Sequence, residues 1–234
     1  MSQPVHGGDR AAGKSVTYHN LWDRIRASLS LKSTYSHPRV REQTARYARN
    51  QAYFDLIAER ASPFLYEIVG EVESRNIPME IALLPFVESA FTPHARSREG
   101  AVGLWQFMPN TGRSLGLQQD WWYDARRDPR SSTAAALDYL QTLNDEFDGD
   151  WLVALAAYNT GSSNVRRAIQ RGGYLIEEAE FWSLQLNSET YAHVPRLLAL
   201  ASVIAEPSFF GIELPIISNT EPVSYIDIGH QIEL

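Results

Sequence analysis

The sequence LLPFVESAF at residues 83–91 says most about the fold and the chemistry of this chain. It places one carboxyl group, that of Glu88, in an apolar run, with Val87 and Ala90 close to it and a phenylalanine beyond each of them. Such surroundings solvate a carboxylate poorly and disfavour its charged form, which is the usual condition for a general acid at neutral pH. Glu88 is therefore a candidate catalytic acid. A solvated glutamate at the end of a helix is the alternative interpretation.

The residues before Glu88 predict that it lies near the C-terminal end of a helix. Pro78 can open this helix, because proline at the first helical position costs no hydrogen bond, and apolar residues follow it at helical spacing. Pro85 lies inside the predicted helix and should kink it. Residues 92–103 are rich in Pro, Ser, Gly and charge, which predicts a loop or short hairpin directly after Glu88.

The rest of the chain also reads as helical, so the expected fold class is mainly α. Cap residues and apolar periodicity mark the later helices. The first of these should bury Ala134, Leu137, Leu140, Leu143 and Phe147. The predicted helices are 129–147, capped by Asp128; 151–158, capped by Asp150; 165–171, capped by Ser162; and about 188–205.

Composition excludes several classes of function. The 234 residues carry 21 Lys+Arg against 28 Asp+Glu, a net charge of −7, which argues against a nucleic-acid ligand because such ligands are usually held by a basic patch. Cysteine is absent and there are six histidines, so structural zinc, iron–sulfur clusters and cysteine nucleophiles are not expected. No metal or organic cofactor is implied. No apolar run approaches the roughly 18 residues of a membrane-spanning helix.

A second motif, GAVGLWQFMPNTG at residues 100–112, follows the predicted loop. Its glycines could let the backbone approach a ligand, Trp105 and Phe107 could stack on sugars, and Gln106 offers both a donor and an acceptor. A glycine-rich turn followed by core aromatic residues explains the same motif without a ligand. Both interpretations stay open from the residues alone.

A third motif, AAYNTG at residues 156–161, places polar groups where a helix must end. Asn159 or Gly161 as an ordinary helix C-cap accounts for two of its residues. That explanation leaves the phenol of Tyr158 without a role.

Taken together and in this order, the three motifs resemble those of the lytic transglycosylases, lysozyme-like bacterial enzymes that cut the glycan strands of peptidoglycan. The resemblance covers about residues 22–212. It rests on Glu88-Ser89, Ser97, Gly100-Ala101, Gly103-Leu104-Trp105-Gln106, Met108-Pro109, Thr111-Gly112, Tyr123-Asp124, Arg126-Arg127-Asp128, Gly149-Asp150-Trp151, Ala157-Tyr158-Asn159, Gly161, Phe181-Trp182-Ser183-Leu184, Glu189-Thr190 and Val194-Pro195.

The resemblance implies a lysozyme-like helical domain of the soluble lytic transglycosylase type and a role for each matching residue. Glu88 would be the sole catalytic acid and base. Ser97 and Gln106 would bind acetamido and hydroxyl groups of the sugar, and Tyr158 would hydrogen-bond near Glu88. Glu189 would contact the stem peptide or brace the cleft, although a charge favoured by the helix dipole explains it equally well. The residues expected to line the groove are Ser97, Gln106, Met108, Tyr158, Asn159 and Glu189.

One residue departs from the pattern of similar proteins, which usually carry tyrosine directly before Val-Pro in the last helix. This chain has His193 before Val194-Pro195. Tyr191, two residues earlier, lies on a different helical face and cannot replace the missing tyrosine. A neutral imidazole at this position could keep one hydrogen bond to the catalytic carboxyl.

The number of carboxylates bears on the reaction expected of such an enzyme. Most glycosidases use two carboxylates, and the 88–106 region offers just one besides Glu88, the Glu99 of an exposed-looking turn. The resemblance implies a single-acid route instead, in which the β-1,4 bond between N-acetylmuramic acid and N-acetylglucosamine breaks without water and leaves a 1,6-anhydro ring. The product of that route weighs less than the hydrolytic one by a water molecule.

Three alternatives belong to other classes. A hydrolytic muramidase or chitinase-like enzyme could use the same fold, because fold alone does not choose the chemistry. An inactive glycan-binding protein could keep the groove. A helical adaptor would use every motif for packing. The cluster Trp121-Trp122-Tyr123 fits either a core or the wall of a sugar groove.

The expected organisation has four parts: a flexible tail at 1–16, a helical extension at 17–60, the catalytic domain at 61–206 and an extended segment at 207–234. The last segment resembles the passage that leads toward LysM glycan-binding modules, and a continuation beyond residue 234 is expected. The resemblance further implies a periplasmic protein, in full length often attached to the outer membrane. It would act as a monomer on peptidoglycan strands, with no nucleic-acid partner and no transmembrane segment in this chain.

Overall fold

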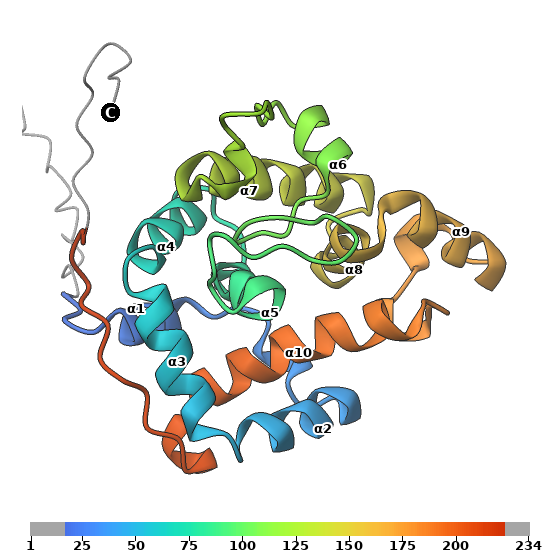
Figure 1. The fold of residues 1–234 in the computed structure, drawn as a ribbon. Coiled ribbons are helices and arrows are strands. Elements are labelled where there is room, and N and C mark those ends of the chain that lie inside the picture. Colours follow the sequence, from blue (N-terminus) through green and yellow to red (C-terminus); the bar gives the residue numbers. More distant parts are fainter. Residues whose placement is uncertain (1–16, 223–234) are drawn as a thin grey trace, which may run out of the picture.

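The computed structural model describes residues 17–222 and is built from helices (Figure 1). Within that range the β-structure is limited to isolated bridges between single residues, so the prediction of a mainly helical fold is confirmed. The predicted tail at 1–16 lies outside the described residues. The elements are α1 (Leu21–Ser28), η1 (Lys32–Thr34), α2 (Pro38–Tyr47), α3 (Gln51–Ala61), α4 (Leu65–Ser74), η2 (Met79–Leu83), α5 (Leu84–Ser89), α6 (Pro109–Ser114), η3 (Ala125–Arg127), α7 (Pro129–Glu146), α8 (Trp151–Thr160), α9 (Ser162–Gly172), η4 (Ile176–Glu178), η5 (Phe181–Ser183), α10 (Ser188–Ala205) and η6 (Pro207–Phe210), where η denotes a 3₁₀ helix.

Two of the predicted helix caps are confirmed and one is wrong. The Asp128 carboxylate accepts a hydrogen bond from the backbone N–H of Ser131 at 2.7 Å and starts α7, and Asp150 likewise starts α8. Gly161, rather than Ser162, occupies the N-cap of α9, with no side-chain hydrogen bond. Its φ of 89° lets the chain turn directly from α8 into α9, which is a backbone conformation that favours glycine.

The continuous, kinked helix predicted from Pro78 is wrong. The chain forms the 3₁₀ helix η2 and then begins a separate short α-helix, α5, with Pro85 in its first turn. Proline lacks an N–H, and its ring would collide with the carbonyl four residues earlier, so it is better accommodated at a helix start than inside a longer helix. Glu88 still lies in the last turn, as predicted. Ala90 and Phe91 follow with φ of 48° and 54°, which reverses the chain abruptly.

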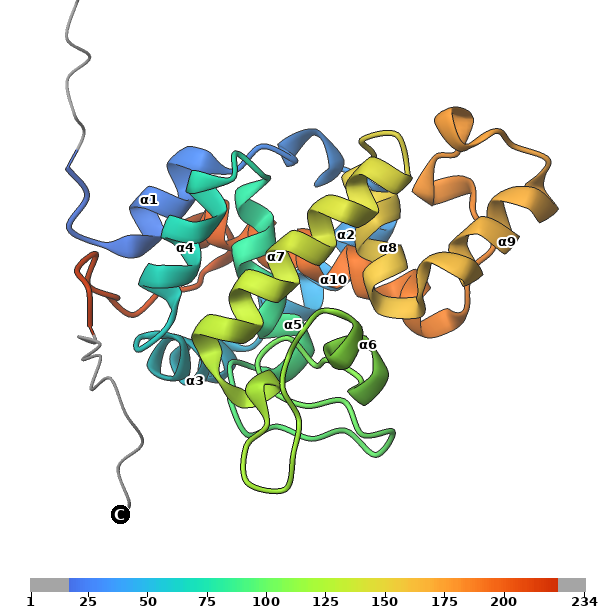
Figure 2. The ribbon, with the colours of Figure 1, turned by 90° about the horizontal axis from the view of Figure 1, so that it is seen from above.

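The core surrounds α8 and α10. Residues 152–157 of α8 are all buried, and α10 is buried along most of its length, where it packs against α2, α8, η2 and α5 (Figures 1 and 2). In α7 the predicted Leu137, Leu140 and Leu143 are buried, whereas the predicted Ala134 is half-buried and Ser132, Thr133 and Ala136 are buried in addition. Leu21 and Trp22 of α1 are completely buried in the same core cluster. The predicted domain divisions after residues 60 and 206 stay predictions.

A buried carboxylate ties the N-terminal segment to this core. Glu80, in η2, is completely inaccessible to solvent. It accepts hydrogen bonds from the backbone N–H groups of Ser30 and Leu31, at 3.3 and 2.8 Å, and from the hydroxyl of Tyr35 at 2.7 Å. Burial and the nearby charge of Glu80 raise the pKa of Tyr35, which keeps this hydroxyl a donor. Sequence patterning did not single out Glu80.

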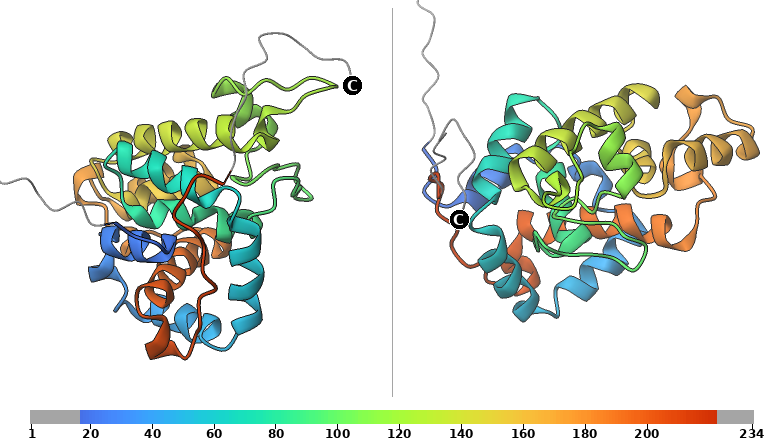
Figure 3. Two further views of the ribbon diagram at one scale, coloured as in Figure 1. Left: turned by 90° about the vertical axis from the view of Figure 1, so that its left-hand side faces the viewer. Right: turned by 45° about the horizontal axis from the view of Figure 1, so that its top comes forward.

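The two ends of the described chain lie side by side next to α1 (Figure 3). The backbone N–H of Leu21 donates to the carbonyl of Ile217 at 2.8 Å, and that of Asn219 donates to the carbonyl of His19 at 3.0 Å. The first residues of the segment predicted to be extended, 207–210, form η6, and residues 211–222 form turns and extended backbone with one isolated bridge. The remainder of that segment, 223–234, is outside the described residues.

Candidate active site

Glu88 is held at the end of α5 by hydrogen bonds on both sides of it. The Tyr53 hydroxyl donates to the carbonyl of Phe86 at 3.2 Å, and the Ser89 hydroxyl donates to that of Leu104 at 2.9 Å. The rings of Phe86 and Phe91 are buried with centroids 4.3 Å apart. Only 12% of the Glu88 side chain is exposed. The shielded position predicted for this carboxyl is therefore present.

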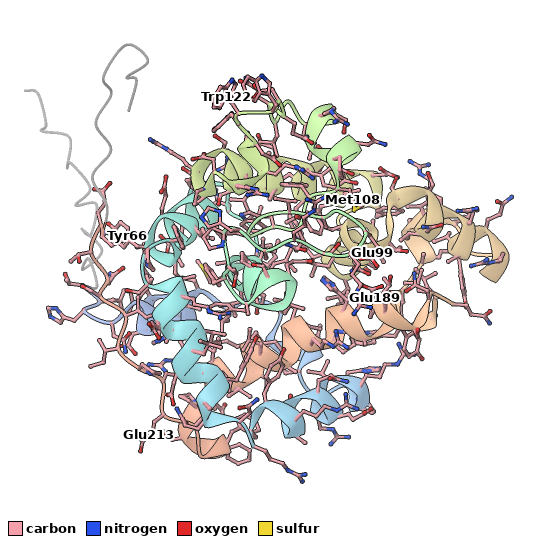
Figure 4. The ribbon with its side chains drawn as sticks, in the orientation of Figure 1. Tyr66, Glu99, Met108, Trp122, Glu189 and Glu213 are labelled. Atoms are coloured by element: carbon pink, nitrogen blue, oxygen red, sulfur yellow. The ribbon has the colours of Figure 1, made fainter. Side chains whose placement is uncertain are left out.

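The predicted site residues gather around one groove. Its volume is about 530 Å³, and its wall includes the candidate acid together with all six residues expected to line it. Figure 4 shows Met108 and Glu189 on different sides of this region, with Glu99 between them. These groove residues come from α5, the loop that follows it, α8 and α10: Glu88, Ser97, Gln106, Met108, Tyr158, Asn159 and Glu189.

A second hollow of about 520 Å³ continues from the groove on the other side of Glu88. The two hollows share part of their walls, namely Val87, Glu88, Ser97, Gln106 and Arg196. A carboxyl at the junction of two hollows can reach a bond whose two halves occupy them. Arg196, an exposed cation of α10, was missed in the sequence because nothing in its local pattern points to Glu88.

The loop after α5 carries two of the groove residues in a defined conformation. The hydroxyl oxygen of Ser97 accepts hydrogen bonds from the backbone N–H groups of Glu99 and Ala101, each at 3.2 Å. Gln106 has a φ of 50°, and its side-chain N–H donates to the carbonyl of Gly103 at 2.8 Å. The loop, with its isolated bridges, agrees with the predicted loop or short hairpin. Both polar side chains are thereby oriented before any ligand is present.

The structure assigns the two aromatic residues and Gly103 of the 100–112 motif to packing, whereas Gln106 lines the groove. A Cβ on Gly103 would overlap the carbonyl oxygen of Arg126, so this glycine permits a close approach between two loops and not between a loop and a ligand. Trp105 is completely buried and donates its indole N–H to the Thr133 hydroxyl at 3.0 Å. Phe107 is 2% exposed. Stacking of sugars on Trp105 is therefore wrong, because the ring is a core residue.

Arg126 fastens this loop, a role that the sequence did not reveal. Its side chain is buried and pairs with Asp124 through two hydrogen bonds of 2.9 and 2.7 Å. It also donates to the carbonyls of Phe107 and Gly100, at 3.0 and 3.2 Å. Burial alone would raise the pKa of Asp124, but the hydrogen bonds and charge of Arg126 lower it below its usual value. The guanidinium group suits this position because its several N–H groups can donate to two carbonyls and a carboxylate at the same time.

Tyr158 and Asn159 line the groove and also hydrogen-bond to other parts of the chain. The Tyr158 hydroxyl donates to the carbonyl of Trp105 at 2.7 Å, and not to Glu88. Burial, and after it the neighbouring Glu88 charge, raises the pKa of Tyr158 well above its ordinary value, so the hydroxyl keeps its proton. Asn159 accepts a hydrogen bond from the Thr190 hydroxyl at 2.7 Å, which links α8 to α10. Gly161 is the helix C-cap, so the cap explanation does not apply to Asn159.

Glu189 fits both of its interpretations. It lies exposed in the first turn of α10, where a helix dipole favours negative charge, and it also forms part of the groove wall. Glu99 is exposed as well and lines the same groove. Among the described residues, these two and Glu88 are the carboxylates that line the two hollows.

His193, which stands where similar proteins have tyrosine, contacts Glu88. Its Nε2 lies 2.8 Å from Oε1 of Glu88, and the exposed fractions of the two side chains are 6% and 12%. Tyr191 faces elsewhere, with the guanidinium of Arg39 over its ring. The imidazole thus keeps a hydrogen bond to the carboxyl, as predicted, and Tyr191 does not take part.

The aromatic cluster in the loop between α6 and α7 lies neither in the core nor in the groove wall. Trp121 and Trp122 are 81% and 79% exposed, with ring centroids 3.8 Å apart and ring planes tilted by 35°, and Tyr123 is 45% exposed. The loop projects from the body of the molecule (Figure 3), and Trp122 lies far from Glu189 (Figure 4). The core interpretation is therefore wrong. The cluster does not line the groove around Glu88, and a place in the wall of a longer sugar groove stays a prediction.

Within residues 17–222, no three His, Asp or Glu side chains are grouped as they would be around a metal ion. None of the helices in that range combines the length and apolar character needed to cross a bilayer.

A helical fold whose groove surrounds one shielded glutamate agrees with the result of comparison with known families. Residues 66–180 match the family described as the transglycosylase SLT domain. The chain therefore contains a transglycosylase SLT domain, and the expected fold type is confirmed.

The chain is also similar to individual proteins of this kind. The membrane-bound lytic murein transglycosylase D of Escherichia coli K12 is 42% identical over 215 residues, which are 92% of this chain and 47% of that protein. The soluble lytic murein transglycosylase of the same strain is 26% identical over 214 residues, covering 83% of this chain and 33% of that protein. The chain thus spans about half the length of the first relative and about a third of the length of the second. A crystal structure of the 70 kDa soluble lytic transglycosylase from Escherichia coli aligns with a TM-score of 0.48 and 24% identity, over 86% of this chain and 34% of that one.

Proposed function

We propose that this chain is a peptidoglycan lytic transglycosylase with Glu88 as its catalytic acid and base. It cleaves the β-1,4 bond between N-acetylmuramic acid and N-acetylglucosamine and leaves a 1,6-anhydromuramic end. The observation that carries the proposal is the position of one shielded carboxyl at the junction of two hollows, in a domain of the SLT family. The names of the relatives support the same substrate.

In the first step, protonated Glu88 donates its proton to the oxygen that links the two sugars, and the bond from C1 of the muramic residue to that oxygen breaks. The 2-acetamido carbonyl of the muramic residue supports the positive charge that develops at C1. The strand bearing the new hydroxyl departs, and Glu88 is left as a carboxylate. A group that supports the charge from within the substrate removes the need for a second protein carboxylate.

In the second step, the carboxylate of Glu88 takes the proton from the C6 hydroxyl of the same muramic residue. The C6 oxygen bonds to C1, which closes the anhydro ring and returns Glu88 to its protonated form. The internal hydroxyl competes with water because well-held intramolecular nucleophiles reach effective molarities of about 10⁵ M or more. The buried rings under α5 support this step by limiting the access of water to Glu88.

The groove residues have binding roles in this scheme. The side-chain N–H of Gln106 is engaged by Gly103, which leaves its carbonyl oxygen to accept from a sugar N–H or O–H. Ser97 binds sugar hydroxyl groups across the junction. Met108, 41% exposed, offers an apolar contact to a sugar face. Tyr158, Asn159 and Glu189 complete the wall, with Glu189 nearest to the surface where a stem peptide would emerge.

The organisation of the whole protein is part of the proposal. Residues 61–206 form the catalytic domain, 17–60 a helical extension, and 207–234 a segment that leads toward glycan-binding modules. The protein acts in the periplasm as a monomer, in full length at the outer membrane. The name of the 42% identical relative, a membrane-bound transglycosylase, supports a membrane association.

Mass spectrometry of the fragments released from murein sacculi tests the proposal. Wild-type protein should release muropeptides with anhydro ends, and Glu88→Gln should release none. Products heavier by one water molecule would make the protein a hydrolase on the same fold. Tight binding of sacculi without any release by the wild-type protein would make it a glycan-binding protein.

A further inference from the structure

The partner of Glu88 is an ionisable side chain with one unused nitrogen. His193 Nε2 lies 2.8 Å from Oε1 of Glu88. The other ring nitrogen, Nδ1, is buried and has no hydrogen-bond partner in the described residues. An imidazole held between a carboxyl on one side and an unpartnered buried position on the other is restricted in the protonation states that it can adopt.

We propose that His193 is a positioning residue that remains neutral, with its proton on Nε2, and donates to Oε1 of Glu88 throughout the reaction. This proposal rests on the function proposed above for Glu88. It assigns the proton transfers of both steps to the second carboxyl oxygen, Oε2, and leaves His193 without a proton-transfer role.

Hydrogen-bond accounting selects this tautomer. An imidazolium carries N–H groups on both nitrogens, and a neutral ring protonated on Nδ1 carries its single N–H there. Either form would bury an N–H donor without an acceptor, which is rarer and more costly than an acceptor left with an unused lone pair. The Nε2–H form places its donor against the carboxyl. A proton added to the Glu88–His193 pair therefore resides on Glu88, which is where a general acid needs it.

The same geometry serves both protonation states of Glu88. The Nε2–H group can donate to Oε1 whether the carboxyl is ionised or carries its proton on Oε2. The bond to Oε1 therefore persists while Oε2 first loses and then regains a proton. The carboxyl does not need to rotate between the two steps, and small displacements of a reacting group are costly, on the order of 100-fold in rate for 1 Å.

No other described side chain takes over this role. The Tyr158 hydroxyl is committed to the carbonyl of Trp105. Arg196 and the exposed Glu99 and Glu189 line the groove without a hydrogen bond to Glu88. The titratable and charged groups that surround the pair are Tyr47 of α2, Tyr53 of α3, Arg96 and Glu99 of the loop, Tyr139 of α7, Tyr158 of α8, and Glu189 and Arg196 of α10.

Substitutions that move a single N–H donor test the proposal. Glutamine can place its amide nitrogen near the position of the imidazole Nε2, whereas asparagine reaches only the position of Nδ1. His193→Gln should therefore keep kcat on a defined peptidoglycan oligosaccharide within about 10-fold of wild type. His193→Asn and His193→Leu should each lose about 100-fold in kcat with KM nearly unchanged. Thermal unfolding of all three variants identifies any that fail to fold.

The pH profile separates positioning from proton transfer. If His193 stays neutral, kcat/KM of the wild type and of His193→Gln should have the same limbs between about pH 5 and 8, the range in which an ordinary histidine titrates. Loss of a limb in His193→Gln would overturn the proposal. ¹⁵N NMR of histidine-labelled protein, with the His193 signal assigned by its absence from His193→Gln, should show one protonated nitrogen, Nε2. Two protonated nitrogens within the active pH range would also overturn it.

The outcomes distinguish this proposal from the function on which it rests. If Glu88→Gln is inactive while His193→Leu is as active as wild type, the role of His193 is wrong and the proposed function stands. If the wild-type products are hydrolytic, the proposed function fails, while the ratio of His193→Gln to His193→Asn rates still reports on the positioning of Glu88.

Discussion

Two glutamates eight residues apart, Glu80 in η2 and Glu88 in α5, lie in the same apolar stretch of sequence but differ in their surroundings. Glu80 is completely buried and its oxygens accept three hydrogen bonds, from Ser30, Leu31 and Tyr35. Glu88 is 12% exposed, accepts from one partner and borders two hollows. A buried carboxyl whose oxygens are all occupied stabilises a fold, and one with an oxygen left over can react.

The largest expected effect comes from Glu88→Gln. The amide keeps the shape of the carboxyl but cannot act as a general acid or base, and such groups contribute about 10²–10⁴-fold to rates. Release of anhydromuropeptides should fall by at least that factor, while the free energy of unfolding is not lowered. Glu80→Gln is the matched control, in which the folded protein should stay active. Equal activity losses in the two variants would remove the distinction between the two carboxyls.

Among changes to the two glutamates and their contacts, Glu80→Ala should have the largest effect on stability. It leaves two backbone N–H groups and the Tyr35 hydroxyl without an acceptor, and each buried unsatisfied group costs about 1–3 kcal/mol. We expect the free energy of unfolding to fall by about 3 kcal/mol in urea denaturation, since part of the cost is relieved by local rearrangement. Glu80→Gln, which retains one acceptor oxygen, should lose less. A Glu80→Ala protein as stable as wild type would contradict the structural role.

Tyr35→Phe isolates one of the contacts of Glu80. A hydrogen bond to a charged group contributes about 1.5–3 kcal/mol, so the free energy of unfolding should fall by about 2 kcal/mol. The rate of the folded enzyme should not change, because the groove lies elsewhere. A kinetic effect without a loss of stability would indicate that Glu80 and the groove are coupled.

Tyr158→Phe is the corresponding change beside Glu88. The lost hydroxyl donates to the neutral carbonyl of Trp105, so the free energy of unfolding should fall by about 1 kcal/mol. Because this hydroxyl does not bond to Glu88, kcat/KM should fall far less than in Glu88→Gln. Kinetics of the two variants on one substrate preparation decide this point, and an equally inactive Tyr158→Phe would give the phenol a direct role in the reaction.

The smallest effects are expected at the projecting loop. Trp121→Ala and Trp122→Ala remove side chains that are about four-fifths exposed, and the free energy of unfolding should change by no more than about 0.5 kcal/mol. Trp105→Ala, at a fully buried tryptophan, is the contrasting variant and should cost about 3–5 kcal/mol. Thermal unfolding compares the three, and a large loss in either loop variant would show that burial is a poor guide here.

Local chemistry made some features predictable. Asp128 and Asp150 cap helices as expected, because an aspartate side chain accepts hydrogen bonds from the backbone N–H groups of the first helical turn. The helix at 188–205 was also expected with its observed ends. The family resemblance, read from three motifs, predicted seven residues of the site, and in the structure all seven line one groove.

Features that depend on distant partners were not predictable. Glu80 finds its donors about fifty residues upstream, and His193 meets Glu88 across a separation of 105 residues. Trp105 is a core residue whose indole N–H finds its acceptor in Thr133 of α7, 28 residues further along the chain. The break before α5 depends on how η2 is packed, which a proline rule alone does not specify. In each case the deciding contact comes from another element, and no local pattern records it.

The adjoining ends of the described chain offer a route to circular permutants. Because Asn219 bonds to His19 and Leu21 to Ile217, a short linker from residue 222 to residue 17 would span little distance. New termini could then be opened in the projecting loop around Trp121, where the side chains contribute little to packing. Such a permuted chain would begin and end at the projecting loop, away from Glu189 (Figure 4), so that cargo fused there would leave the groove open.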